Sequence, residues 1–149
     1  MQNRTEVYVS LIYILAAIPY VWLGLHAWRK RPAVAVTPFA WVMLGMSIWS
    51  FGYGLELFFP YLSFKLFFAK IEYIGIISIP VWLLFFALEF TGKSHVLTPR
   101  LRLLLWIFPF MMLVLVWTNE FHQLVWSMAK VVEIRNLHLL DVRFGLFFW

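Results

Sequence analysis

The sequence contains no cysteine, and only 13% of its 149 residues are charged. The absence of cysteine excludes disulfides, thiolate catalysis and cysteine-ligated metal sites. Hydrophobic residues make up 64% of the chain, whereas soluble domains are about 45–50% apolar and about 25% charged. This composition excludes an ordinary soluble domain and indicates an integral membrane protein.

Motifs for catalysis, metals and nucleic acid are also missing. No glycine-rich phosphate loop is present, and the four histidines have no metal-ligand spacing. The net charge of +5 does not indicate nucleic-acid binding, because the basic residues form short clusters at the ends of apolar runs. We therefore expect no catalytic residue, no cofactor, no metal and no nucleic-acid partner for this segment.

Four apolar stretches approach or exceed the length of about 20 residues that crosses a bilayer. They cover about residues 7–28, 37–59, 66–90 and 103–117, and a fifth apolar run begins at about residue 144. The predicted fold is an all-α integral membrane protein, a multi-span bundle of transmembrane helices. Because the fifth run is too short to cross, we expect residues 1–149 to be an incomplete transmembrane domain whose output domains are absent. Partial alternation in residues 131–144, broken at Arg135-Asn136, permits a short β-hairpin that caps the bundle.

The positions of lysine and arginine predict the orientation. Three basic residues follow the first span and three follow the third, whereas only Lys65 lies between the second and third spans. Cytoplasmic loops carry an excess of lysine and arginine. We therefore expect a multi-pass protein of the cell (inner or plasma) membrane, with the N-terminus and residues 60–65 and 118–143 outside.

The third span carries charged residues that are costly inside a membrane. At about 1.5 Å per residue, Glu72 and Glu89 lie about 25 Å apart along one helix, near opposite faces of the bilayer. The same counting puts Glu56 of the second span near the outer face. An antiparallel helical hairpin folded about residues 61–63 would place Glu56 opposite residues 68–70, which predicts a Glu56–Lys70 pair.

Two interpretations of these charges stay open. Glu56, Lys70 and Glu72 either line an outward-facing polar cavity or are interfacial side chains that reach headgroups or water. Two nearby carboxylates could also share a proton, as in a transporter. Pro80, in the middle of the third span, is a candidate hinge because proline removes a helical hydrogen bond, although such prolines are also common in ordinary membrane helices.

Three blocks keep a distinctive order and spacing. They are residues 49–57 (WSFGYGLEL), residues 70–92, which contain KIEYIGI, Pro80 and LLFFALEFTG, and residues 118–126 (TNEFHQLVW). Together they resemble the N-terminal seven-transmembrane sensor region of bacterial histidine kinases. In that family the membrane region precedes cytoplasmic modules such as PAS, histidine kinase or diguanylate cyclase domains. The resemblance implies an input module that relays an outer-side or intramembrane signal to signalling domains of the same longer chain, and we also expect a homodimer in the lipid bilayer.

The third block predicts a binding site. If the segment after the fourth span is helical, Asn119, His122 and Trp126 share a face at i, i+3 and i+7. We therefore expect an outer pocket that binds an unknown small ligand or responds to pH through His122, bounded by Glu56, Lys70, Glu72, Asn119 and His122. The alternative is that Asn119 caps a helix and His122 only forms hydrogen bonds at the interface.

A second function class remains open. A fragment of a small ion-coupled transporter or channel could use Glu56 and Glu72 for ion coupling. Such a protein would end after its last span or repeat itself, and the sequence contains no internal repeat. A sensor would instead continue through further spans into soluble output domains.

Overall fold

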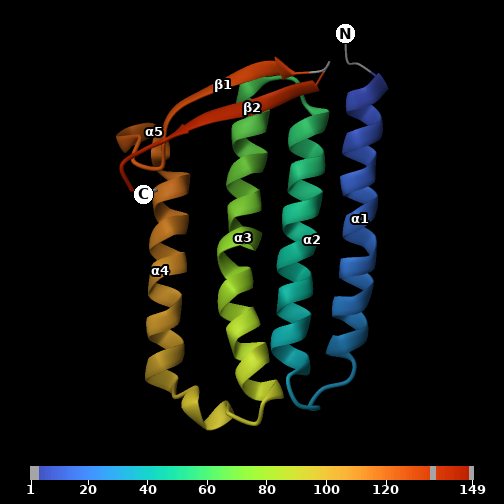
Figure 1. Cartoon of the computed structure of the whole chain (residues 1–149), viewed down its shortest axis with the longest axis vertical. Coiled ribbons are helices and arrows are strands. Elements are labelled where there is room, and N and C mark those ends of the chain that lie inside the picture. Colours follow the sequence, from blue (N-terminus) through green and yellow to red (C-terminus); the bar gives the residue numbers. More distant parts are fainter. Residues whose placement is uncertain (1–3, 135–136, 148–149) are drawn as a thin grey trace.

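The computed structural model describes residues 4–134 and 137–147 of the chain. Four long helices follow one another antiparallel: α1 (Arg4–Trp28), α2 (Val36–Phe58), α3 (Leu62–Phe90) and α4 (Pro99–Trp117). Each packs against its neighbour in sequence, so that the helices stand in a row (Figure 1). The short helix η1 (Ser94–Val96) connects α3 to α4, and the single turn α5 (Asn119–His122) follows α4.

A two-stranded antiparallel sheet covers one end of the row. Its strands are β1 (Trp126–Ile134) and β2 (Leu137–Phe144), and they lie across the ends of α1, α2 and α3 (Figure 1). The expected β-hairpin is therefore confirmed, although β1 begins earlier than residue 131, and the expected break at residues 135–136 lies outside the described residues. We call this end of the bundle the hairpin end.

Three of the long helices are apolar and long enough to cross a membrane: α1 with 25 residues, α3 with 29 and α4 with 19. Helix α2 has 23 residues but carries several tryptophan, tyrosine, serine and glycine residues, which lower its hydropathy. The fold is thus mostly helical with three candidate spans and one small sheet, and the fourth expected span stays a prediction.

Two helices begin four residues before the expected spans. Helix α4 starts at Pro99 because the side chain of Thr98 accepts a hydrogen bond from the backbone N–H of Leu101 at 3.2 Å, and proline is favoured in the first turn. Helix α3 starts at Leu62 instead of residue 66, which shortens the connection from α2 to residues 59–61.

Glycines bring α2 and α3 close together. A Cβ atom added to Gly75 would collide with the backbone carbonyl of Gly45, and one added to Gly52 would lie 2.7 Å from Cγ of Glu72. Small residues at such positions let the backbones of membrane helices approach closely. The α2–α3 contact therefore sets the positions of the side chains that follow toward the hairpin end.

The fifth span stays a prediction. Phe144 is the last residue of β2, and residues 145–147 turn back toward the start of β1. The backbone N–H of Gly145 donates to Val125 at 2.8 Å, and that of Phe147 donates to Leu124 at 3.1 Å. Residues 148–149 lie outside the described part of the chain.

Candidate functional site

Four ionisable side chains are buried at the hairpin end. The exposed fraction is 2% for Glu6, 6% for both Glu56 and Glu72, and 0% for Lys65. Together with His138 of β2, which contacts Glu6, they form what we call the hairpin-end cluster. Burying charged groups costs several kcal/mol per ion unless they are paired, so this cluster is the first candidate for a functional site.

Lys65 joins the first turn of α3 to the end of α2. Its Nζ donates a hydrogen bond to the backbone carbonyl of Glu56 at 2.7 Å, and the ammonium group also interacts electrostatically with the carboxylates of Glu56 and Glu6. The sequence predicts that Lys65 belongs to the outer turn between the second and third spans. That placement is wrong because α3 begins at Leu62, which brings Lys65 into the helix and into the interior.

Glu72 lies about two helical turns deeper than Lys65 on the same face of α3. Its Cγ packs over Gly52 of α2, and its carboxyl group lies within hydrogen-bonding reach of the carboxyl group of Glu56. Oε1 of Glu72 is buried and has no hydrogen-bond partner among the described residues. The structure thus brings together the two carboxyl groups that depth counting along the sequence predicts near the outer face.

Glu6 connects the cluster to the sheet. Its Oε1 accepts a hydrogen bond from the backbone N–H of His138 at 2.6 Å and lies 2.7 Å from Nδ1 of the same histidine. Sequence reasoning missed both residues, because Glu6 precedes the first apolar stretch and His138 lies in a segment without helical periodicity. One signal was available for Lys65: Lys65, Ala69, Glu72 and Gly75 follow i, i+4, i+7 and i+10 spacing, which is one face of a helix.

Lys70 does not join the cluster. It forms an ion pair with Glu120 of α5, and its Nζ also donates to the backbone carbonyl of Trp117 at 3.3 Å. The predicted Glu56–Lys70 pair is therefore wrong, because the early start of α3 puts Lys65 opposite Glu56. The Lys70 ammonium hydrogen-bonds the Glu120 carboxylate and lowers the pKa of Glu120 from its ordinary value.

Asn119 and His122 shape the turn between α5 and β1. Oδ1 of Asn119 accepts hydrogen bonds from the backbone N–H groups of Val125 and Trp126 at 3.0 Å each, and its Nδ2 donates to the carbonyl of Trp126 at 2.9 Å. Nδ1 of His122 accepts from the N–H of Leu124 at 3.0 Å. Both side chains therefore have local structural partners, but Asn119 does not cap a helix as the alternative interpretation expected, because its partners are Val125 and Trp126.

The helical face expected for residues 119–126 is not formed. Helix α5 ends at His122, because Gln123 adopts a left-handed conformation with φ of 53° and the chain then enters β1. Trp126 and Asn119 consequently share no helix face. They are joined by hydrogen bonds between the side chain of Asn119 and the backbone of Trp126. Pro80, the candidate hinge, lies within α3, which is continuous from Leu62 to Phe90.

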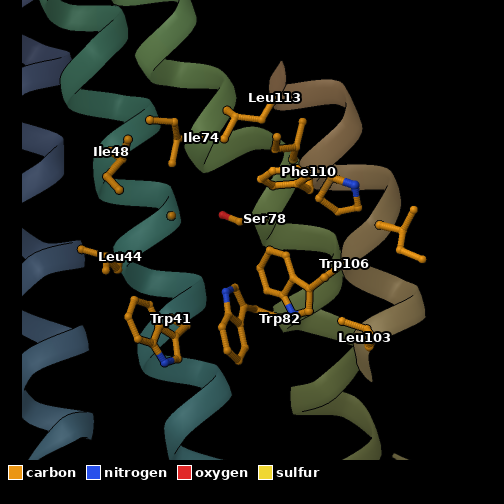
Figure 2. A pocket seen from close by; sticks show the side chains of 14 residues that line it. Trp41, Leu44, Ile48, Ile74, Ser78, Trp82, Leu103, Trp106, Phe110 and Leu113 are labelled. Atoms are coloured by element: carbon orange, nitrogen blue, oxygen red, sulfur yellow. The ribbon is translucent and has the colours of Figure 1, made fainter. Parts of the chain in front are cut away.

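A second candidate region lies in the middle of the bundle. An open cavity of about 560 Å³ separates α2 from α4 over the surface of α3 (Figure 2). We call it the apolar groove; its lining consists of Trp41, Leu44, Gly45, Ile48, Ile74, Ile77, Ser78, Trp82, Leu103, Trp106, Ile107, Pro109, Phe110 and Leu113.

The groove has no charged side chain in its lining. Trp82 stacks on Trp41 with ring centroids 5.4 Å apart and meets Trp106 edge to face at 5.4 Å. Ser78 is the one hydroxyl in the lining, and its Oγ donates to the carbonyl of Gly75 at 2.9 Å within α3. The groove is thus suited to apolar groups and offers no chemistry for catalysis or ion binding.

Comparison with known proteins decides the family. The model of the N-terminal seven-transmembrane region of histidine kinases matches residues 12–149. The chain belongs to this family. It is a multi-pass membrane sensor region and not a catalytic domain, and the family implies the lipid bilayer and cytoplasmic signalling domains as its partners. Comparisons with curated proteins and with solved structures gave no match.

Proposed function

We propose that this sensor region receives a stimulus at the hairpin end and relays it by helix displacement to cytoplasmic signalling domains of the same longer chain. The observation that carries the proposal is the hairpin-end cluster. Glu6 binds His138 of the sheet, and Lys65 binds the end of α2. A movement of the sheet is therefore coupled through buried polar contacts to α1, α2 and α3.

The proposed topology has four spans, with α2 included and the N-terminus outside. At about 1.5 Å per residue, the 23 residues of α2 extend about 35 Å, enough to cross a hydrocarbon core of about 30 Å. Helix α2 packs between α1 and α3, which supports its place in the membrane despite its lower hydropathy. The clusters at residues 29–31 and 93–102 lie in the loops and the first turn of α4 at the end opposite the hairpin end, which the positive-inside rule assigns to the cytoplasm.

Within the proposed relay, α3 carries the signal from the hairpin end to the opposite face. It holds Lys65 and Glu72 at one end and Pro80 in its interior, where the missing N–H leaves one helical hydrogen bond unformed. We propose that this point lets the two halves of α3 move relative to each other. The small ligand and the homodimer expected for this region also remain proposals.

Measurement of autokinase activity tests the relay. In the full-length protein in membrane vesicles, we expect Lys65→Met to change autophosphorylation at least fivefold, because it removes the cation from the cluster. Lys93→Met, at the opposite end of α3 and exposed, is the matched control and should change it less than twofold. Size-exclusion chromatography in detergent checks folding. A folded Lys65→Met protein with unchanged autophosphorylation would contradict the relay.

Labelling of single cysteines tests the topology. The sequence has no cysteine, so one introduced residue is unique within it, and any cysteine elsewhere in the full-length chain would be replaced. We expect a membrane-impermeant maleimide to label Glu133→Cys in intact cells and Ser94→Cys only after permeabilisation, since both sites are exposed and lie at opposite ends. The reverse pattern would overturn the orientation.

A further inference from the structure

We infer that Glu56 and Glu72 share one bound proton, and that this proton holds α2 and α3 together at the hairpin end. The site deepens the proposed function, because it names the proton as the ligand of the cluster, and its link to kinase activity rests on that function. The existence of the proton site rests on the geometry alone.

The hydrogen-bonding chemistry of the two carboxyl groups requires a proton. An ionised carboxylate only accepts hydrogen bonds, so two ionised carboxylates cannot bond to each other. The Glu56 and Glu72 carboxyl groups nevertheless lie within hydrogen-bonding reach, and Oε1 of Glu72 is buried with no donor among the described residues. A proton on one of the two carboxyl groups supplies the missing donor.

The charges around Glu56 and Glu72 also favour one bound proton. The groups around the pair are Tyr53 from α2 and Lys65 and Tyr73 from α3, with Glu6 from α1 and His138 from β2 beyond Lys65. The Lys65 ammonium offsets the charge of Glu56, whereas Glu72 interacts with Glu56 and with no cation among the described residues. One proton shared by the two carboxyl groups leaves the pair with a single negative charge, which Lys65 balances.

The room around Glu56 and Glu72 suits a proton better than a metal ion. Glu56 and Glu72 are each 6% exposed, and Cγ of Glu72 lies so close to Gly52 that a Cβ there would be 2.7 Å away. No group of three or more metal-ligating side chains exists within residues 4–134 and 137–147. A metal ion takes several oxygen ligands at fixed distances, whereas a proton needs only the two carboxyl groups.

The bound proton has a consequence for the conformation. When it leaves, two buried negative charges face each other, and like charges at this distance repel strongly. The repulsion separates α2 from α3 at the hairpin end, where Lys65 joins α3 to the end of α2 and Glu6 joins α1 to the sheet. Low pH therefore favours the packed arrangement described here, and high pH favours a loosened one.

Infrared spectroscopy of the full-length protein in lipid vesicles tests the proton directly. We expect the C=O stretching band of a buried protonated carboxyl group in the wild type, a shift of this band in D2O, and its loss at high pH. Glu72→Gln and Glu56→Gln, both nearly isosteric, should each abolish the band, whereas Glu89→Gln on the same helix should leave it. Persistence of the band in both folded cluster variants would overturn the inference, as would its loss when sodium replaces choline at constant pH.

Kinase measurements in the same vesicles separate this inference from the proposed function. We expect wild-type autophosphorylation to change at least fivefold across the pH range in which the band disappears, and Glu72→Gln to reduce that change to less than twofold. A band that titrates without any change in kinase activity supports the proton site and contradicts the relay. An effect of Lys65→Met on the kinase without a carboxyl band supports the relay and overturns the proton site.

Discussion

The hairpin end and the apolar groove both include parts of α2 and α3, yet the two regions differ in how enclosed they are and in the chemistry of their side chains. At the hairpin end the sheet covers the bundle, and Glu56, Lys65 and Glu72 are each at most 6% exposed. In the groove, α2 and α4 stand apart, and the lining is apolar and open (Figure 2). The difference arises because only the first region has an element that packs across several helices.

This difference assigns separate roles to the two regions. A covered set of ionisable groups responds to protonation and to movement of its cover, because charges in an enclosed site interact strongly. An open apolar surface within a bilayer gains little from burial, because lipid tails are as apolar as its side chains. We therefore propose that stimulus response belongs to the hairpin end, and we expect the groove to contact lipid tails.

We expect the largest difference in stability between the two regions when one tryptophan is removed from each. Trp126 is 5% exposed and packs against Val116, Val125 and the ring of Tyr73. Trp126→Ala should lower the free energy of unfolding by about 3–5 kcal/mol, the usual cost of removing an enclosed tryptophan. Trp106→Ala in the open groove should cost less than half of that, because lipid replaces the lost contacts.

Unfolding by SDS in mixed micelles measures both tryptophan variants. Trp126→Phe is the control for the hairpin end, since it keeps an aromatic ring against Tyr73 and should recover part of the loss. Equal losses for Trp126→Ala and Trp106→Ala would mean that the groove is as enclosed as the hairpin end, and the contrast between the regions would fail.

A methyl group added at Gly52 tests how closely the cluster is packed. In Gly52→Ala the new Cβ would lie 2.7 Å from Cγ of Glu72, so Glu72 must move. We expect a loss of about 1–3 kcal/mol, typical of overpacking, together with loss of the carboxyl infrared band. Gly24→Ala is the matched control, because its Cβ would meet Met43 and Ala40 at 3.3 Å and 3.4 Å.

The two glycine variants are compared by SDS unfolding and by infrared spectroscopy of the same samples. A Gly52→Ala protein with wild-type stability and an unchanged carboxyl band would show that Glu72 is not held against α2. Equal losses in both variants would instead indicate a general cost of methyl groups between these helices.

The helices, the sheet and the family could be predicted from the sequence because each leaves a local pattern. Long apolar runs ended by basic residues or proline predicted the helices, and alternation in residues 131–144 predicted the hairpin. The pairing of side chains could not be predicted in the same way. The chain turns at residues 59–61 instead of 61–63, so that Lys65 and not Lys70 is the neighbour of Glu56, and the sequence does not specify that difference.

Only part of the candidate site could be predicted, because helical position follows a local pattern and side-chain pairing does not. Glu56 and Glu72 were placed together because depth counting depends only on helical rise, which is constant. Glu6 and His138 could not be predicted, because their contact joins residues 132 positions apart and depends on β2, which crosses the ends of the helices. Asn119 and His122 were assigned to the pocket on the assumption of a continuing helix, which Gln123 ends with its left-handed backbone.

The smallest expected effect concerns the ion pair between Lys70 and Glu120, which lies at the hairpin end outside the buried cluster. Because Lys70 lowers the pKa of Glu120, the pair stabilises the fold above the ordinary glutamate pKa of about 4.3, and this contribution disappears as the pH falls through the lowered value. The side chain of Glu120 is 59% exposed, so Glu120→Gln should cost at most about 1 kcal/mol at neutral pH.

The difference in unfolding free energy between wild type and Glu120→Gln, measured at several pH values and salt concentrations, checks this sign. It should shrink toward zero at low pH and also shrink at high salt, because exposed charges are screened. A difference that grows as the pH falls would contradict the assignment. In infrared spectra recorded at the same salt concentrations, the carboxyl band of the buried pair should stay unchanged. Burial protects Glu56 and Glu72 from screening by salt, whereas Glu120 is exposed to it.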